Sequence, residues 1–574
     1  MKNNTISESK NIEFENLNKE DFLKNYYSEN INYTYTKKND INNNNNSDKK
    51  YIPIKKIKKH KLFHRSTNSL KPIIPNEILL NKERCHKLNQ DMIKKVKKNI
   101  SLNLDEFFTK KRHFLIMTDG GKPVYSRYGD AVNNNSIFAT VSAMITKFTI
   151  FNSTHNYKED LNIISNNKNK IVFVKKGQLF FIAISKKNDS ISLLHSQLEY
   201  LYNQLMSILT VKFYEKLENN PSKCLTAMSD TENLFEQIIK YSSNSFVSLF
   251  NSYHVMSYIS HRKKLNKLVE EYRGDALYCI IMTPYEIISL AHSNVINVVP
   301  SDLVLIQTLI YCTEMLRTQV SYVPICLPGV SDQGYIQLYS QFTQENIGII
   351  FITENIDSNH FSKFQKQFTN LYQKLTENGF IEKIIDSMMY NNNITKKKTL
   401  MNNNNNNNDE IKSPLIKSIY KINSVEIKDK NGKDGKIKRK TDRSLTTKFP
   451  KAKREELILG TIKYGVVLNK KLNQYFLINF DMDFRVLNKA EKLLIKKYNL
   501  LFDIYNCDEK NKEKKEYFFI DRREDYINVI LVDENYLSIC SYEFELSIDG
   551  ALNNSYDFHK YLNKKDYKYF ILFK

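Results

Sequence analysis

Residues 113–130 read HFLIMTDGGKPVYSRYGD, and this stretch decides the class of fold. Five mostly apolar residues, 113–117, are followed by the turn sequence DGGK (119–122) and by a second apolar segment, 123–128. Two apolar runs separated by an Asp-Gly turn predict a β-hairpin. We therefore expect the first folded block to open with a pair of antiparallel strands.

A helix, two strands and a second helix are expected after this hairpin. The first helix is predicted at 136–151, and the strands at 170–175 and 178–185. Asp189 is expected to cap the second helix, in which apolar residues recur at spacings of 3 and 4: Ile191, Leu194, Leu198, Leu201, Leu205 and Ile208. This spacing gives one apolar face, which we expect to pack on the sheet.

The same order of elements recurs twice more. In the second copy, strands are predicted at 276–283, 286–292, 322–327, 334–343 and 347–353, with helices at 300–316 and 361–375. In the third, strands are predicted at 457–464, 474–480, 516–520, 527–532 and 537–546, with a helix at 486–501. Hairpin-linked strands interrupted by one helix predict α/β (α+β) units with antiparallel sheets flanked by helices, and not a parallel Rossmann array.

At 574 residues the chain exceeds a single compact domain, and its net charge of +23 is unevenly distributed. Residues 1–110 hold 23 basic and 13 acidic side chains, and residues 391–455 hold 18 and 7. Both segments are rich in Asn and Lys, which predicts a disordered basic N-terminal arm (1–110) and a disordered linker (391–454). The predicted folded domains are 111–255, 256–390 and 455–574.

Several functional classes are disfavoured by composition. The folded blocks are close to neutral, so we expect no nucleic-acid partner for them. No run of 18 apolar residues and no N-terminal apolar signal segment occurs, which argues against a membrane-spanning or secreted protein. Seven cysteines fit no zinc or redox spacing and are expected to be reduced thiols of a cytoplasmic protein.

No enzyme motif is present. Phosphate-loop, dinucleotide-binding, serine-hydrolase and zinc-protease motifs are all absent, and histidines and carboxylates form no recognisable acid/base constellation. We therefore expect no catalytic residues, metal or cofactor, and favour a binding or scaffolding protein.

The segment GKPVYSRYG (121–129) resembles the opening hairpin of the SAND family, the Mon-type vacuolar fusion proteins. Further segments are similar to the same family in colinear order: 171–186, 197–210, 300–303, 324–328 with 334–335, and 544–546. The chain departs from the family pattern at Tyr322, where the family has Trp, and at Val330, where it has Phe. The resemblance therefore extends over all three predicted folded domains.

This resemblance implies three longin-type domains and a pairing with a second tri-longin protein of the Ccz type. The heterodimer would be a guanine-nucleotide exchange factor for a late-endosomal or vacuolar Rab GTPase, peripherally associated with the membranes of those organelles. In paired longin domains the first helix contributes to the platform for the GTPase. The residues expected to contact GTPase or partner are Lys122, Arg127, Thr140 and Lys147.

The basic segments are expected to contact an anionic or phosphoinositide membrane surface, because clustered lysines are attracted to such surfaces. The expected membrane contacts are Lys55, Lys56, Lys58, Lys59, Lys436, Lys438, Arg439 and Lys440. Two other interpretations stay open at this point: a non-catalytic longin subunit of a trafficking tether or adaptor, and an RNA-binding protein that uses the basic arms. The Lys content can also follow from an AT-rich coding sequence, without any function.

Overall fold

The computed structural model describes most of the three predicted folded blocks. The described residues are 104–129, 134–155, 160–166, 169–187, 189–209, 232–257, 259, 261–354, 359–388, 459–480, 483–484, 486–507, 516–523 and 525–572. The chain divides into two compact units, residues 1–73 with 165–167 and residues 74–164 with 168–574. Apart from Ser165 and Asn166, every described residue belongs to the second unit. The predicted linker and most of the predicted N-terminal arm lie outside the described residues.

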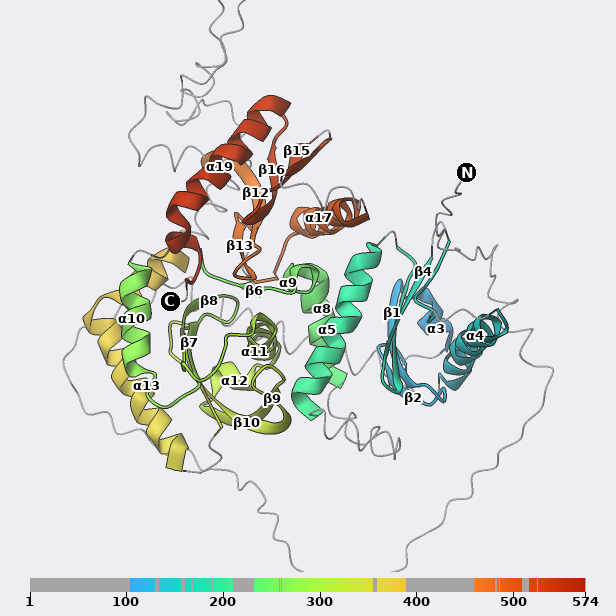
Figure 1. Cartoon of the computed structure of the whole chain (residues 1–574), viewed down its shortest axis with the longest axis horizontal. Helices are drawn as coiled ribbons and strands as arrows, with labels where there is room; N and C mark the ends of the chain where they lie inside the picture. Colours follow the sequence, from blue (N-terminus) through green and yellow to red (C-terminus); the bar gives the residue numbers. More distant parts are fainter. Residues whose placement is uncertain are drawn as a thin grey trace, which may run out of the picture. The chain divides into compact units, whose positions relative to one another are not determined.

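The first sheet has five strands in the order β2-β1-β5-β4-β3, and the pairs β1–β2, β1–β5 and β4–β5 are antiparallel. Figure 1 shows helices α4 and α5 on opposite faces of this sheet. The elements are β1 (Arg112–Thr118), β2 (Pro123–Ser126), α4 (Asn135–Thr154), β3 (Ile163–Ser165), β4 (Lys170–Lys176), β5 (Leu179–Ser185) and α5 (Ile191–Leu209). The predicted hairpin and helices are present, whereas the short strand β3 was not anticipated.

Both faces of β1 are buried, which explains why its sequence is a continuous apolar run. Alternate side chains of a strand point to opposite faces. Phe114 and Ile116 pack in the core shared with α5, whereas Leu115 and Met117 pack in the core beneath α4.

The expectation of a disordered arm up to residue 110 is wrong at its C-terminal end. Residues 104–109 form the short helix α3 (Leu104–Thr109). Its Phe107 is buried, and the Phe107 ring centroid lies 4.1 Å from that of His113 on β1. Aromatic packing against the sheet therefore orders this turn of helix despite its polar surroundings in the sequence.

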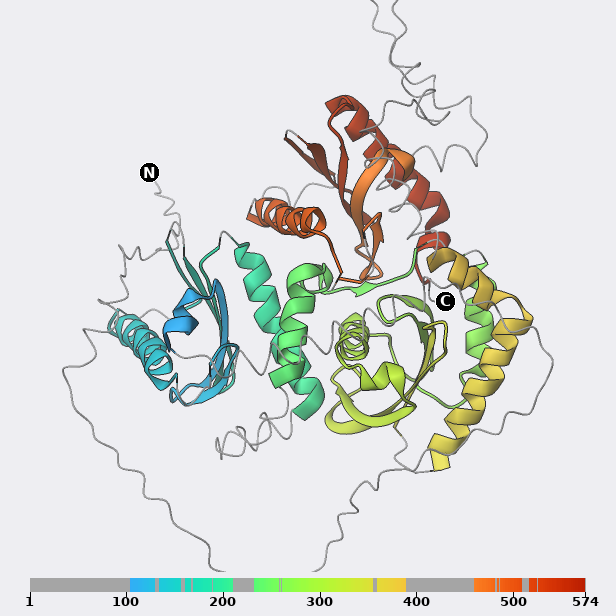
Figure 2. The same cartoon turned by 180° about the vertical axis from the view of Figure 1, so that it is seen from behind.

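The second sheet repeats the topology, with strand order β8-β7-β11-β10-β9 and antiparallel neighbours throughout. Helix α11 lies on one face, and α13 covers the other together with α10 (Figure 2). The elements are β7 (Tyr278–Met282), β8 (Ile287–His292), α11 (Pro300–Cys312), α12 (Met315–Thr318), β9 (Ser321–Leu327), β10 (Ser331–Phe342), β11 (Gly348–Thr353) and α13 (Asn359–Glu377).

The third sheet has the same order, β14-β15-β16-β12-β13, with one more strand, β6, at its end. Helices α17 and α19 lie on its two faces (Figures 1 and 2). The elements are β12 (Ile462–Asn469), β13 (Gln474–Ile478), α17 (Lys489–Cys507), β14 (Tyr517–Arg522), β15 (Tyr526–Val532), β16 (Tyr536–Glu543) and α19 (Ile548–Tyr569). The predicted start of the first strand at residue 457 is wrong, because residues 459–461 are helical. Helix α19 was not anticipated.

Within its described residues, the segment that connects the first and second sheets contains four elements that the sequence did not reveal: α8 (Glu232–Asn244), α9 (Val247–Phe250), β6 (Tyr253–His254) and α10 (Arg262–Tyr272). Strand β6 runs parallel to β13, and the N–H of Val255 donates to the carbonyl of Tyr475 at 2.9 Å. The next residue, Met256, donates to Ile287 of β8 at 3.0 Å. Residues 253–256 therefore bond to one edge of the second sheet and one edge of the third. The predicted domain boundary at 255/256 falls inside this shared segment, and the boundaries stay a prediction.

Candidate interaction surface

The GKPVYSRYG segment fixes where α4 begins. Gly129 has φ +70°, a conformation that L side chains rarely adopt, and a Cβ there would lie 2.6 Å from Nδ2 of Asn134. That amide donates to the carbonyl of Tyr128 at 2.9 Å, and the Ser126 hydroxyl donates to the same carbonyl at 2.7 Å. The end of the hairpin and the residue before α4 are thus held together by backbone-directed hydrogen bonds.

Arg127 forms an ion pair with Glu236 of α8. Its Nε lies 2.7 Å from Oε2 of Glu236, and its Nη2 lies 3.1 Å from Oε1. The two side chains are only 10% and 4% exposed. The guanidinium, which the sequence analysis expected to face a partner, therefore ties the hairpin to α8 and has little surface left for a second protein. Its role as a partner contact stays a prediction.

Lys122 lies in the turn between β1 and β2. Its backbone N–H donates to Oγ1 of Thr118 at 3.1 Å, and its carbonyl accepts the N–H of Thr118 at 3.0 Å. These two hydrogen bonds involve only backbone atoms of Lys122. The role of the Lys122 side chain as a contact for GTPase or partner therefore stays a prediction.

Helix α4 has an apolar and poorly buried surface. Its sequence NSIFATVSAMITKFTIFNST contains one charged residue, Lys147. Its buried residues are Ile137, Phe138, Val141 and Asn152, whereas Lys147 is exposed and Ile150 and Phe151 are 58% and 50% exposed. Thr140 is half-buried, and its hydroxyl donates to the carbonyl of Ser136. The C-terminal half of α4 thus presents Ile150 and Phe151 to solvent, among exposed threonines, a serine and a single lysine.

The equivalent helices of the other two sheets are covered differently. Almost all of α11 is buried, because α5, α8 and β6 pack around it. Helix α17 is amphipathic: it carries exposed lysines, and its apolar face contributes Leu494, Ile495 and Tyr498 to the core. Helix α17 also exposes two apolar side chains, Leu493 (58%) and Ile504 (48%), but it carries four lysines, whereas Ile150 and Phe151 share α4 with a single charged residue.

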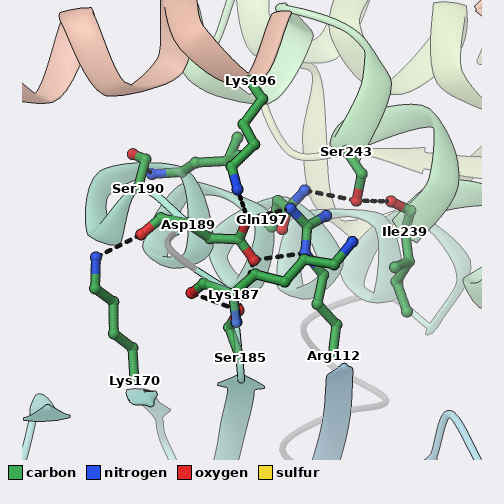
Figure 3. A network of polar contacts seen from close by, with 11 residues as sticks. Arg112, Lys170, Ser185, Lys187, Asp189, Ser190, Gln197, Ile239, Ser243 and Lys496 are labelled. Atoms are coloured by element: carbon green, nitrogen blue, oxygen red, sulfur yellow. Dashed lines mark hydrogen bonds and ion pairs between the residues drawn. The ribbon is translucent and has the colours of Figure 1, made fainter. Parts of the chain in front are cut away.

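A polar cluster joins strand ends of the first sheet to α5, α8 and α17 (Figure 3). The expectation that Asp189 caps α5 is wrong. The Ser190 hydroxyl accepts the N–H of Leu193 instead, while the Asp189 carboxylate accepts two hydrogen bonds from Arg112. Lys496 of α17 lies 3.9 Å from the same carboxylate. Burial raises the pKa of Asp189, but the Arg112 bonds outweigh it and the net pKa lies below the ordinary value. The cluster is therefore a charged structural junction.

The third domain contains an arrangement that resembles a hydrolase triad. His559 of α19 contacts Asp533 through Nδ1 at 2.7 Å and the Ser538 hydroxyl through Nε2 at 2.7 Å. Ser538 is 1% exposed and faces α19 from the interior of β16. A nucleophile must reach its substrate, so this geometry supports a structural role in fixing α19 to the sheet.

The described ranges hold no group of metal ligands and no bilayer-spanning helix. No three His, Cys, Asp or Glu side chains there are grouped so that they could hold a metal ion. Within the same ranges, no helix combines the length and the apolar character needed to span a bilayer.

Comparison with known proteins agrees with the topology. Residues 112–243 match the family model described as the first longin domain of FUZ, MON1 and HPS1, and residues 274–370 match the second longin domain of the same proteins. The chain therefore contains two longin domains, and its third sheet, outside both matches, has the same strand order.

The curated relatives are vacuolar fusion proteins. The chain is 27% identical over 257 residues to the vacuolar fusion protein MON1 homologue of Arabidopsis thaliana (44% of this chain, 41% of the relative) and 28% identical over 252 residues to that of Oryza sativa (43% of each). It is 23% identical over 296 residues to MON1 of Yarrowia lipolytica (50% of this chain, 52% of the relative). The chain thus spans about half the length of the relatives it matches, and its resemblance to the Mon-type SAND family is confirmed.

Proposed function

We propose that this chain is a subunit of a guanine-nucleotide exchange factor for a late-endosomal or vacuolar Rab GTPase. It would pair with a second, Ccz-type tri-longin protein and act in endosome maturation, vesicle trafficking and vacuole fusion. The similarity to vacuolar fusion proteins named MON1 supports the cellular process. The observation that carries the molecular part of the proposal is the uncovered apolar face of α4.

The α4 face has the composition of a protein-binding surface. Interface centres are depleted of charge and enriched in aromatic side chains, and α4 offers Phe151 and Ile150 beside the single charge of Lys147. An apolar helix face of this kind is costly to leave in water, so we expect partner or GTPase to cover it. The proposed contacts are therefore Thr140 and Lys147, together with the exposed Ile150 and Phe151.

The proposed mechanism needs no covalent chemistry. An exchange factor accelerates nucleotide release by binding the open, nucleotide-free GTPase more tightly than the GDP-bound form. Such activity depends on surface complementarity, so single substitutions on α4 should reduce it by graded amounts.

The test is the release of fluorescent GDP from endosomal Rab GTPases by the purified chain with its co-purified partner. Lys147→Glu and Phe151→Asp should slow release roughly tenfold, because each replaces part of a contact surface without disturbing the core. Lys366→Glu, the same charge reversal on the exposed face of α13, is the matched control and should not change the rate.

Two outcomes would contradict parts of the proposal. Unchanged exchange by both α4 variants would remove α4 from the GTPase surface. No exchange by the wild-type complex on any endosomal Rab, with partner pairing intact, would favour the alternative of a non-catalytic tether or adaptor subunit.

Membrane attachment through the basic segments is a separate part of the proposal. The predicted contacts around Lys55–Lys59 and Lys436–Lys440 lie outside the described residues. Deleting residues 51–61 and 428–440 should weaken flotation with phosphoinositide liposomes, and unchanged flotation would assign these lysines no membrane role.

A further inference from the structure

We propose that β14 is a pairing edge through which two copies of this chain join their third sheets. Each of the three sheets has two edge strands, when β6 is counted as a short segment added to β13. Edges β8 and β13 are both bonded to residues 253–256. Edge β2 contains Pro123 and packs Tyr125 against Phe235 of α8, and edge β9 contains Pro324 and packs against α5.

Two edges remain among the described strands, β3 and β14. Strand β3 has only three residues, whereas β14 has six. Proteins usually protect an exposed edge with proline, with charged side chains such as lysine, or with a bulge. Strand β14 has no proline, lysine or bulge, and its charged residues, Asp521 and Arg522, lie at its C-terminal end. A strand of high β-propensity with an unprotected edge is a template for a further strand.

The outward backbone groups of β14 can be assigned. The N–H of Arg523 donates to the carbonyl of Tyr526, and the register with β15 is unbroken. Odd-numbered residues of β14 therefore bond to β15, and the N–H and C=O groups of Phe518, Ile520 and Arg522 point away from it. These three residues supply an alternating row of donors and acceptors for another chain.

Among the side chains of these three residues, Phe518 and Arg522 are exposed and Ile520 is half-buried. Phe518 is 49% exposed and lies on the same face as Arg522, whose guanidinium sits 4.6 Å from the ring centroid of Phe544. Phe544 is itself 42% exposed. The opposite face of the strand is covered, since Tyr517 contacts Tyr505 of α17.

A second copy fits this edge because the strand is self-complementary. Antiparallel pairing about a two-fold axis at Phe519 places Phe518 opposite Ile520, both with outward backbone groups. It also places Glu516, which is exposed, opposite Arg522 at both ends of the strand pair. Opposite charges and apolar pairs in register stabilise such a pair, and the isologous contact closes as a dimer.

The test is sedimentation of the full chain, purified with any partner that accompanies it. We expect the wild type to contain two copies at micromolar concentration. Glu516→Arg and Arg522→Glu each place like charges opposite one another and should weaken the dimer about tenfold, whereas the double charge swap should restore it. Melting temperatures of all variants separate lost pairing from lost folding.

A cysteine variant tests the register. Phe519→Cys should form an intermolecular disulfide under mild oxidation, because Phe519 faces its own copy, and Phe518→Cys should not. A wild-type chain that holds one copy at all concentrations overturns the proposal. So does unchanged dimerisation in both single charge variants, or coverage of β14 by a different protein.

Discussion

Replacing Arg127 by Met should destabilise the first domain and leave partner binding per folded molecule unchanged. The guanidinium makes two hydrogen bonds to Glu236, which belongs to a helix 109 residues further along the chain. Burial lowers the pKa of Arg127, but Glu236 raises it more, so the net pKa lies above the ordinary value and the guanidinium stays ionised. The substitution therefore leaves a buried carboxylate without its main partner.

The size of the effect follows from what remains around that carboxylate. Removing one member of a buried ion pair costs about 3–5 kcal/mol. Lys240 lies 3.3 Å from Oε1 of Glu236 and is only partly buried, so it offsets some of this cost. We expect a loss of about 2–3 kcal/mol, which lowers the melting temperature of a domain of this size by roughly 5–10 °C.

The assay is urea and thermal unfolding of the full chain, with partner binding and GDP release measured on the folded protein. Lys111→Met removes a basic charge at an exposed site next to β1 and should change the stability by less than about 0.5 kcal/mol. The double variant with Glu236→Leu should cost less than the two single variants together, because the unpaired carboxylate is then absent. An Arg127→Met chain of unchanged stability that fails to bind its partner would refute this reasoning and restore the contact role.

Two further predictions concern the second sheet. Gly329→Ala should lower the free energy of unfolding, measured by thermal unfolding, by about 1–3 kcal/mol, because the new Cβ would lie 2.6 Å from both Oδ2 of Asp302 and Cγ2 of Val299. Gly334→Ala in the same hairpin is the control: its Cβ would meet nothing closer than 3.8 Å, so stability should not change. Burial raises the pKa of Glu286 to about 8, so the folded chain binds a proton that the unfolded chain has released, and stability should fall as the pH rises. Burial lowers the pKa of His254 to about 3, so this group makes stability rise with pH, but only below pH 6.5. Between pH 6.5 and 8, urea unfolding should therefore show a loss of stability of roughly 1–2 kcal/mol, and Glu286→Gln should abolish that loss. An unchanged dependence of stability on pH in that variant would assign the effect to another group.

The regular elements were predictable because their signals are local. The apolar run with a Gly turn gave the opening hairpin, and the 3 and 4 spacing gave α5, whose Leu194, Leu198 and Leu201 are buried as expected. Three repeats of one order of strands and helices were visible because each strand is bounded by turn residues. Fold class therefore followed from pattern alone.

The missed features depend on residues far apart in the sequence. Strand β6 is two residues long and exists because β13, more than 200 residues away, offers it a parallel edge. Asp189 and Ser190 are both good capping residues, and Arg112 decides between them by occupying the Asp189 carboxylate. The contact role expected for Arg127 could not be weighed without knowledge of Glu236.

The exposure of α4 also depends on long-range packing. Because α4 is exposed, substitutions on its surface can change binding without changing stability. Helices α4 and α11 hold the same place in the same topology, and both are strongly apolar. Residues 232–256 enclose α11: Gln307 accepts the N–H of His254 and donates to its carbonyl, both at 2.9 Å. No described segment does the same for α4. The same kind of substitution should therefore have different consequences in the two helices. Polar residues in α11 should unfold the second domain, whereas polar residues at Ile150 or Phe151 should change only what α4 binds.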